Sequence, residues 1–216
     1  MPVFKLTEEL IFPHPSLAEE GVLAVGGDLS AERLLLAYQN GIFPWYNEGE
    51  PIIWHAPDPR FVLFPERFKK SKSLKQLIKK ALYKCSINND FENVIRNCRN
   101  IKRKNQYGTW INDEMISAYI KLHKLGFATS VEVYNTKKEL AGGLYGVKLG
   151  KVFFGESMFS KESNTSKIAL SFLIENTDLK LIDTQVYTQH LESLGGEYIS
   201  LNYFLSLLKK YIPLTI

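Results

Sequence analysis

The sequence predicts an α+β fold, because segments of helical and of strand periodicity follow one another in blocks. Helical spacing dominates up to about residue 126, a period of two covers residues 128–157, and helices alternate with short strands after that. The chain has 216 residues, of which 45% are hydrophobic and 23% charged, as is typical of a soluble globular protein. That length allows one large domain, or a medium and a small one.

The first sixty residues are rich in proline and glycine and contain one clear helical segment. Ser30 is expected to be the N-cap of this helix, with Glu32 in its first turn, and Gly41 is expected to end it. We place a domain boundary near residue 62. The chain is thereby divided into an N-terminal domain of residues 1–62 and a larger domain of residues 63–216.

Three further helices are expected before the strand region. In the first of them, Leu74, Leu77 and Ile78 share one side, and lysines occupy the opposite side. The third begins at Asn112 with two acidic residues in its first turn, where carboxylates are favoured, and Gly126 stops it. The expected ranges of the three helices are 71–82, 91–98 and 112–126.

A period of two then replaces the helical spacing, which predicts an antiparallel meander of three strands. A helix, a buried strand, a short helix, a strand around Tyr198 and a closing helix complete the chain. The expected strands of the meander are 128–134, 139–147 and 151–157. The expected later elements are a helix over 164–175, a strand over 179–183 and a helix over 202–211.

The net charge of +4 hides a strong asymmetry along the chain. Residues 67–104 hold thirteen Lys or Arg side chains and only two acidic ones, whereas residues 1–60 hold three basic and nine acidic ones. A basic block of this density favours a polyanionic partner over a merely solvated helix face. Its cations would neutralise phosphates without reading bases. The candidates for RNA contacts are Lys69, Lys70, Lys72, Lys75, Lys79 and Lys80, followed by Arg96, Arg99, Lys102, Arg103 and Lys104.

The remaining composition excludes several classes of protein. Cys85 and Cys98 fit neither a disulfide framework nor a metal-binding spacing, and the four histidines are scattered. No apolar run is long enough to cross a bilayer, and the N-terminus lacks the basic-then-apolar pattern of a signal peptide. We therefore expect a cytoplasmic protein with no metal site, no cofactor and no membrane partner. Because no exposed heptad pattern is present, we expect a monomer.

Polar side chains that could do chemistry lie near the expected ends of two strands. Glu156 falls at the end of the third strand of the meander, and Asp183 and Gln185 fall at the end of the later buried strand. Residues two apart on a strand point to the same side, so Asp183 and Gln185 are expected to share a face. We expect all three side chains to converge on one cleft.

Five short segments carry a further signal: GGDLS at 26–30, GIFPWY at 41–46, GESMFS at 155–160, SNTSK at 163–167 and LIDTQV at 181–186. In this order and spacing they resemble the leucyl/phenylalanyl-tRNA–protein transferases, from about residue 12 to about residue 205. The resemblance implies an enzyme that moves leucine or phenylalanine, and methionine less well, from aminoacyl-tRNA to the N-terminal lysine or arginine of a protein, which marks that protein for degradation. It also implies a GCN5-related acetyltransferase type of fold for the larger domain.

The resemblance also implies roles for individual residues. Asp183 would orient and polarise Gln185, which would engage the attacking amine; a direct proton-acceptor role for Asp183 is an equal alternative. Glu156 would hold the cationic acceptor, through its α-amine or the side chain behind it, and the alternative is a structural ion pair with Lys167. The aminoacyl pocket would be formed by Trp45, Trp110, Leu144, Phe153, Met158 and Leu173, where Leu173 competes with its neighbour Phe172 for the inward position.

Such a reaction is the aminolysis of an activated ester, which needs orientation, a proton acceptor and a donor for the developing oxyanion rather than an enzyme nucleophile. An acetyl-CoA-dependent transferase is disfavoured, because segment 160–165 lacks the glycine-rich phosphate loop. A peptidoglycan-bridge aminoacyltransferase shares the aminoacyl-tRNA donor but is typically longer and lacks the Gly-Gly-Asp segment. A non-catalytic tRNA-binding protein would use the basic block without needing Glu156, Asp183 or Gln185.

Overall fold

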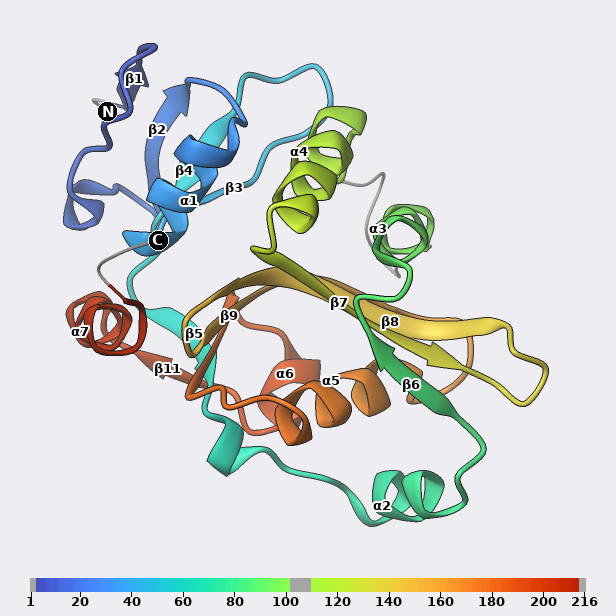
Figure 1. Ribbon diagram of the computed structural model, residues 1–216. Coiled ribbons are helices and arrows are strands. Elements are labelled where there is room, and N and C mark those ends of the chain that lie inside the picture. Colours follow the sequence, from blue (N-terminus) through green and yellow to red (C-terminus); the bar gives the residue numbers. More distant parts are fainter. Residues whose placement is uncertain (1–2, 102–109, 214–216) are drawn as a thin grey trace.

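Two β-sheets organise the chain, a small one in the first 55 residues and a large one that begins at residue 60 (Figure 1). The computed structural model describes residues 3–101 and 110–213. The small sheet has the strand order β1-β2-β4-β3, and the large sheet has the order β11-β5-β10-β9-β8-β7-β6. The strands of the small sheet are β1 (Phe4–Leu6), β2 (Val22–Gly26), β3 (Phe43–Pro44) and β4 (Ile53–His55). Those of the large sheet are β5 (Arg60–Leu63), β6 (Lys84–Ile87), β7 (Ala128–Tyr134), β8 (Leu140–Leu149), β9 (Val152–Ser160), β10 (Leu181–Gln185) and β11 (Glu197–Ile199).

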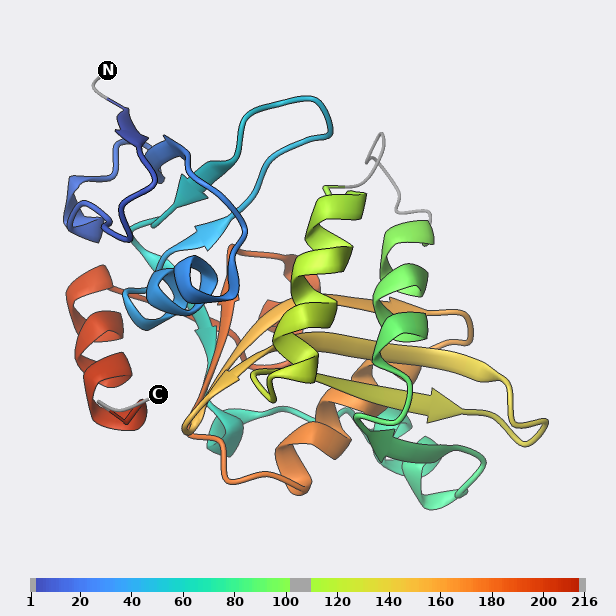
Figure 2. The same cartoon turned by 45° about the horizontal axis from the view of Figure 1, so that its top comes forward.

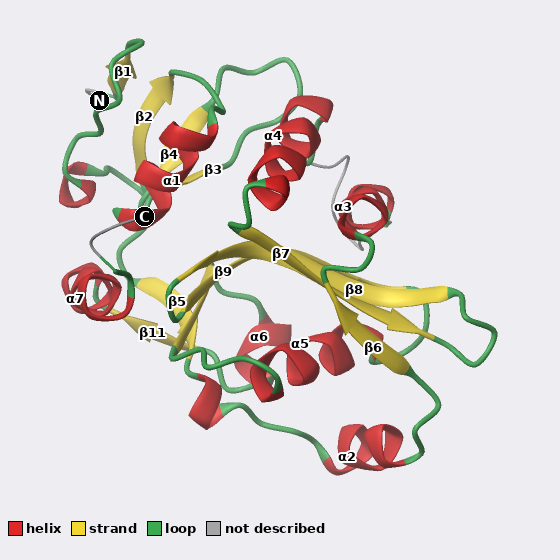
Figure 3. Cartoon of the chain, in the orientation of Figure 1, coloured by secondary structure: helices red, strands yellow, loops and turns green. Residues whose placement is uncertain are grey.

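Helices cover both faces of the large sheet (Figures 1 and 2). Helices α3 and α4 lie over one face, with α1 next to α4, whereas α5 crosses the other face and α2 lies beyond it. Figure 3 shows this layering of helix, sheet and helix by colour. The helices are α1 (Ala31–Gln39), α2 (Lys72–Lys79), α3 (Phe91–Asn100), α4 (Asp113–Lys124), α5 (Thr165–Glu175), α6 (Gln189–Ser193) and α7 (Leu201–Tyr211).

The predicted helix signals are confirmed at both ends of several helices. The hydroxyl of Ser30 accepts a hydrogen bond from the backbone N–H of Arg33 at the start of α1, and the side chain of Asn112 accepts one from Met115 at the start of α4. Gly41 follows α1 with φ +71°, and a Cβ there would lie 2.9 Å from the ring of Phe204. Helix α2 ends at Lys79, earlier than predicted, because Ala81 turns the backbone to φ 52°.

The meander is present, but two of its strands are longer than predicted. Strand β7 has the predicted bounds, whereas β8 runs to Leu149 and β9 to Ser160. The turn between β8 and β9 consists of residues 150–151, so the connection is shorter than the predicted strand bounds of 139–147 and 151–157 imply. Glu156 therefore lies inside β9 and not at the end of a strand, which corrects the placement expected from periodicity.

Two hydrophobic clusters fill the spaces on the two sides of the large sheet. One extends from the small sheet and α1 to α3, α4 and α7, and it contains Trp54, Tyr38 and Phe154. The other lies between the sheet and α5, with Leu144, Phe153 and Leu173 among its members. Among the described residues, no helix combines the length and the apolar character needed to cross a bilayer.

Candidate functional site

Glu156 is the extra residue of a β-bulge in β9. In the ladder with β8, Tyr145 is opposite Ser157 and Gly146 is opposite Gly155, so Glu156 has no partner of its own. A bulge of this kind re-aims the side chain of the extra residue. The carboxylate of Glu156 accordingly points toward the helices α1 and α4, away from the cluster beneath α5.

The carboxylate of Glu156 accepts three hydrogen bonds from three different elements. Tyr38 of α1 donates its hydroxyl to Oε1 at 2.8 Å, and Tyr119 of α4 donates its hydroxyl to Oε2 at 3.0 Å. Gln185 of β10 donates its Nε2 to Oε1 at 2.9 Å. The two tyrosine hydroxyls also contact each other. These contacts replace the ion pair with Lys167 that was the structural alternative for Glu156.

The electrostatic environment of this cluster favours uncharged groups. Burial raises the pKa of Glu156 to about 7; the hydrogen bonds from Tyr38, Tyr119 and Gln185 oppose this shift, and the charge of Asp183 adds to it. Burial also raises the pKa of both tyrosines well above 10. The tyrosines therefore remain hydrogen-bond donors at neutral pH, and Glu156 is the group whose charge can change there.

Asp183 is fully buried and forms an ion pair with Arg60 of β5. Arg60 donates Nε to Oδ1 at 2.9 Å and Nη2 to Oδ2 at 2.7 Å, which is the bidentate geometry that makes such pairs strong. The Arg60 guanidinium lies between two rings, 4.6 Å from the centre of Phe43 and 4.8 Å from that of Phe204. Both side chains of the pair have no exposed surface.

Gln185 lies where β10 departs from regular strand geometry. Its φ is 67°, and the pairing of β10 with β5 shifts register between Asp183 and Gln185. The simple two-residue alternation expected from the sequence is therefore interrupted. Asp183 Oδ1 accepts a hydrogen bond from the backbone N–H of Gln185 at 2.9 Å, while the side-chain amide of Gln185 turns to Glu156. All three predicted polar residues thus lie in one hydrogen-bonded chain.

The six residues expected in the aminoacyl pocket fall into two groups. Leu144, Phe153 and Leu173 are buried in the cluster beneath α5, and Met158, opposite Leu144 in the β8–β9 ladder, packs against them. Phe172 is only partly buried, so Leu173 takes the inward position. The two tryptophans are elsewhere. Trp110 packs against the cluster on the α4 side, and Trp45 is 41% exposed on the N-terminal segment, with its ring 5.9 Å from that of His55.

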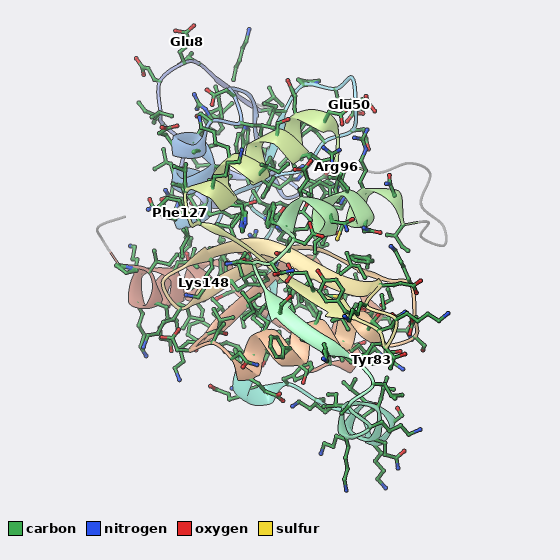
Figure 4. All side chains as sticks on the ribbon, turned by 45° about the vertical axis from the view of Figure 1, so that its right-hand side comes forward. Glu8, Glu50, Tyr83, Arg96, Phe127 and Lys148 are labelled. Atoms are coloured by element: carbon green, nitrogen blue, oxygen red, sulfur yellow. The ribbon has the colours of Figure 1, made fainter. Side chains whose placement is uncertain are left out.

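The predicted cations of α2 and the segment before it are mostly free in solvent. Figure 4 shows the side chains of α2 pointing outward from a helix that stands apart from the sheet. Lys70 is the partly buried member and pairs with Glu175, and Lys80 lines a cavity of about 510 Å³ between α2 and the start of α5. The exposed members are Lys69, Lys72, Lys75, Lys79 and Lys80.

The second part of the basic block is engaged differently. Arg96 pairs with Glu92 on α3, and Arg99 pairs with Asp113 at the start of α4. Lys102, Arg103 and Lys104 lie outside the described residues.

Three residues of the polar cluster were not predicted from the sequence: Arg60, Tyr38 and Tyr119. Arg60 precedes an apolar run that could have been recognised as a short buried strand, and an arginine beside such a strand needs a carboxylate partner. Tyr38 and Tyr119 lie in segments for which the sequence predicts helices. A buried tyrosine hydroxyl normally has a hydrogen-bond partner, so the residue type is the signal in the sequence that could have placed these two side chains near a polar group.

Comparison with known proteins identifies relatives along nearly the whole chain. The family model described as leucyl/phenylalanyl-tRNA protein transferase matches residues 62–209, and the model of its N-terminal domain matches residues 27–58. A leucyl/phenylalanyl-tRNA–protein transferase of Flavobacterium johnsoniae is 55% identical, covering 96% of this chain and 99% of its own length. One of Syntrophobacter fumaroxidans is 53% identical, covering 99% and 92%.

Solved structures give a much weaker likeness. A conserved Bacteroides thetaiotaomicron protein of unknown function overlaps 74% of this chain and 57% of its own, with a TM-score of 0.44 and 10% identity. A likeness of this strength supports no conclusion about fold or function.

Proposed function

This chain belongs to the leucyl/phenylalanyl-tRNA–protein transferase family, and we propose that its Glu156–Gln185 pair presents the amine of an acceptor protein to the aminoacyl ester. The enzyme is an aminoacyltransferase that moves an amino acid from tRNA to a protein. The proposed donors are leucyl- and phenylalanyl-tRNA, with methionyl-tRNA used less well. The proposed acceptors begin with lysine or arginine and are marked for degradation by the added residue. We propose a cytoplasmic monomer.

The observation that carries this proposal is the convergence of Glu156 and Gln185 from two neighbouring strands. Strands β9 and β10 run parallel and pair only as far as Phe154 and Asp183. Beyond that point each strand carries an irregularity, the bulge at Glu156 and the left-handed residue Gln185, and the two side chains meet at 2.9 Å. A carboxylate and an amide oxygen side by side can accept hydrogen bonds from an ammonium or amine group.

The α-amine of a protein has a pKa of about 7.7–8.0, so a useful fraction is neutral near pH 7. The neutral nitrogen attacks the carbonyl carbon of the ester, and the bond between that carbon and the ribose oxygen breaks. Holding the amine against the ester turns a bimolecular encounter into an oriented reaction within one complex. Asp183 contributes by holding the backbone at Gln185 through its 2.9 Å hydrogen bond.

The apolar side chains beneath α5 are the proposed binding site for the amino acid to be transferred. Leu144, Phe153 and Leu173 belong to one buried cluster, against which Met158 packs, and Phe153 pairs with Ile182 near the point where β9 and β10 separate. Trp45 and Trp110 would complete the site from the other side. Selection by shape is worth about 1–3 kcal/mol per methylene, which explains why methionine should be transferred at a reduced rate.

We also propose that α2 and the segment before it bind the tRNA. Charge reversal in the double variant Lys75→Glu, Lys79→Glu should weaken tRNA binding and flatten its dependence on salt, because each lost phosphate contact reduces the slope of log K against log salt by about 0.7–0.9. Lys209→Glu, an exposed charge reversal on α7, is the control, because α7 and α2 lie on opposite sides of the molecule in Figure 1. Equal salt slopes in the α2 variant and the wild type would rule out this site.

The proposed architecture follows the sequence division into residues 1–62 and 63–216, with a GCN5-related acetyltransferase type of fold in the second part. It is supported by the separate hydrogen bonding of the small and large sheets. The divergence of the parallel neighbours β9 and β10 after three paired residues supports the fold type, because it opens the sheet where the reacting groups meet.

The transfer assay separates this function from its rivals. Purified protein, leucyl-tRNA and a peptide beginning with lysine should yield a peptide with one added leucine, detected by mass spectrometry. A peptidoglycan-bridge aminoacyltransferase would leave the α-amine unmodified, and a non-catalytic tRNA-binding protein would yield unchanged peptide. An unchanged peptide at low salt, with leucyl-tRNA bound, would refute the proposed function.

A further inference from the structure

We propose that Glu156 takes up the proton released by the attacking amine, and that Arg60, acting through Asp183, is a positioning residue that keeps Gln185 against Glu156. The inference rests on the proposed transfer function and assigns the proton acceptor within it. It decides between the two roles that the sequence leaves open for Asp183.

The contacts of Asp183 close it to a substrate. Its two oxygens together accept three hydrogen bonds, two from Arg60 and one from the backbone N–H of Gln185. Neither its side chain nor that of Arg60 has any exposed surface. A carboxylate in this state has no exposed oxygen to offer an incoming amine. Glu156, in contrast, retains 8% exposure.

The tyrosine cluster around Glu156 has a place for one more proton, which burial favours, while the hydrogen bonds from Tyr38 and Tyr119 favour the ionised carboxylate. Three close contacts join Tyr38, Tyr119 and the carboxylate: one between the hydroxyls and one from each hydroxyl to Glu156. Two hydroxyl groups supply only two hydrogens for these three contacts. When Glu156 is ionised, one contact lacks a hydrogen, and when Glu156 is protonated, its own hydrogen fills that place. Its pKa of about 7 lies near that of an α-amine, which suits exchange between them.

The polar side chains that act on Glu156 come from α1, α4 and β10. Tyr38 comes from α1, Tyr119 from α4, and Gln185 and Asp183 from β10. The charge of Asp183 raises the pKa of Glu156, but it is paired with Arg60 of β5. Glu156 is therefore the member of this group whose protonation state changes near neutral pH.

Arg60 connects the proton acceptor to the rest of the molecule. Its guanidinium lies between Phe43 of β3 and Phe204 of α7, and it clamps Asp183 of β10. Asp183 in turn holds the backbone N–H of Gln185, whose φ of 67° is a conformation that L-residues seldom adopt. Because this conformation directs the amide of Gln185 to Glu156, a change at Arg60 is expected to reach the reacting groups.

The proton balance of the step is complete without any further reactant. The neutral amine nitrogen forms a bond to the carbonyl carbon and becomes positively charged. One of its protons passes to the carboxylate of Glu156. The carbon–oxygen bond to the ribose then breaks, and the leaving oxygen takes the proton back from Glu156. The products are an amide and a free ribose hydroxyl, and the carboxylate is regenerated.

The test compares Glu156→Gln, Asp183→Asn and Arg60→Lys in single-turnover transfer of leucine to one peptide from pH 5.5 to 9, with thermal unfolding measured for each. Arg67→Lys is the matched control, because Arg67 also forms an ion pair (with Glu197) and lies over a ring (Phe64) but is largely exposed. The peptide is the same throughout, so the titration of its amine is common to all variants.

Glu156→Gln should lose about 100-fold or more in rate and retain only the titration of the peptide amine. Arg60→Lys should fold and lose about 10- to 100-fold in the maximal rate. It should leave the KM for leucyl-tRNA and the enzyme titration near pH 7 unchanged, and Arg67→Lys should match the wild type. Asp183→Asn should likewise keep the enzyme titration.

Loss of the pH 7 titration in Asp183→Asn with its retention in Glu156→Gln would overturn the inference, as would a wild-type rate in Arg60→Lys. If Asp183→Asn does not fold, the pH–rate profiles of Arg60→Lys and Glu156→Gln are sufficient to decide whether Glu156 accepts the proton. Failure of the wild-type protein to transfer leucine would instead refute the proposed function, so the two failures are distinguishable.

Discussion

At the scale of single residues, the site shows how environment separates two carboxylates that lie on neighbouring strands. Asp183 faces a guanidinium that satisfies both of its oxygens, whereas Glu156 faces only neutral donors. Burial raises the pKa of Glu156 to about 7, against the opposing effect of these hydrogen bonds. This difference could not be predicted from the sequence, because it depends on Arg60, Tyr38 and Tyr119, which are distant along the chain.

The raised pKa of Glu156 predicts a dependence of stability on pH. The pKa of Glu156 in the folded protein, about 7, lies above the ordinary value of 4.5. The loss of stability caused by its buried negative charge is therefore absent below pH 4.5 and complete above pH 7. This loss is about 3 kcal/mol, from about 1.36 kcal/mol per pKa unit. The free energy of unfolding of Glu156→Gln, relative to that of the wild type, should therefore increase as the pH rises from 4 to 8. Denaturant titrations at both pH values check this, and a constant difference would contradict it.

Removal of one hydroxyl from the cluster should shift the activity profile in a known direction. The hydrogen bond from Tyr119 lowers the pKa of Glu156, so Tyr119→Phe should raise that pKa. The acid limb of the transfer rate should move to higher pH, with a several-fold loss at pH 7 and a smaller loss at pH 9. The pH–rate profile measures this. A limb that moves to lower pH would be incompatible with the arrangement of donors around Glu156.

At the scale of secondary-structure elements, local signals predicted the helices well and the sheet only in part. Caps such as Ser30 and Asn112 depend on residues a few positions apart, and both were confirmed. The short strands β4, β5 and β6 were not predicted, because each has three or four residues and depends on partners far along the chain. The two irregularities at the site have the same origin: each exists only in relation to a neighbouring strand.

The bulge at Glu156 depends on the glycine opposite it. A Cβ at Gly146 would lie 2.1 Å from the carbonyl oxygen of Phe154, whereas one at Gly155 would meet nothing closer than 3.5 Å. Gly146→Ala should destabilise the fold by roughly 1–3 kcal/mol through overpacking and should reduce transfer. Gly155→Ala, next to Glu156, should change stability much less. Thermal unfolding and the transfer rate of both variants check this, and equal behaviour would show that the bulge tolerates a side chain at residue 146.

At the scale of the whole molecule, Glu156 and Arg60 are contacted by parts from both ends of the chain. Tyr38 comes from the first forty residues and contacts Glu156 on the central strand β9, whereas Phe204 comes from the last helix and contacts Arg60 on β5. The sequence predicted that Glu156, Asp183 and Gln185 lie together, and the structure joins them in one hydrogen-bonded chain. The sequence could not indicate that the small sheet and α7 support the site through the rings on Arg60.

A change in α7 should therefore reach the chemistry. Phe204 is fully buried and lies over Arg60, so Phe204→Ala should cost about 3–5 kcal/mol of stability and lower the transfer rate of the folded protein. Tyr203→Ala is the control, because Tyr203 is 50% exposed on the same helix. Denaturant unfolding and transfer assays at a temperature where both variants are folded provide the measurement. A normal rate in Phe204→Ala would show that Arg60 does not need this ring.

In the proposed mechanism Glu156 and Gln185 hold the acceptor amine beside the ester, and a structure of the protein with both substrates bound would show this contact. The complex would contain a non-hydrolysable leucyl-adenosine amide and a peptide that begins with lysine. The α-amine nitrogen is predicted to lie about 3 Å from an oxygen of Glu156 or Gln185, with the leucine side chain against Leu144 and Phe153. An amine bound elsewhere, with Glu156 still enclosed by Tyr38, Tyr119 and Gln185, would contradict the account.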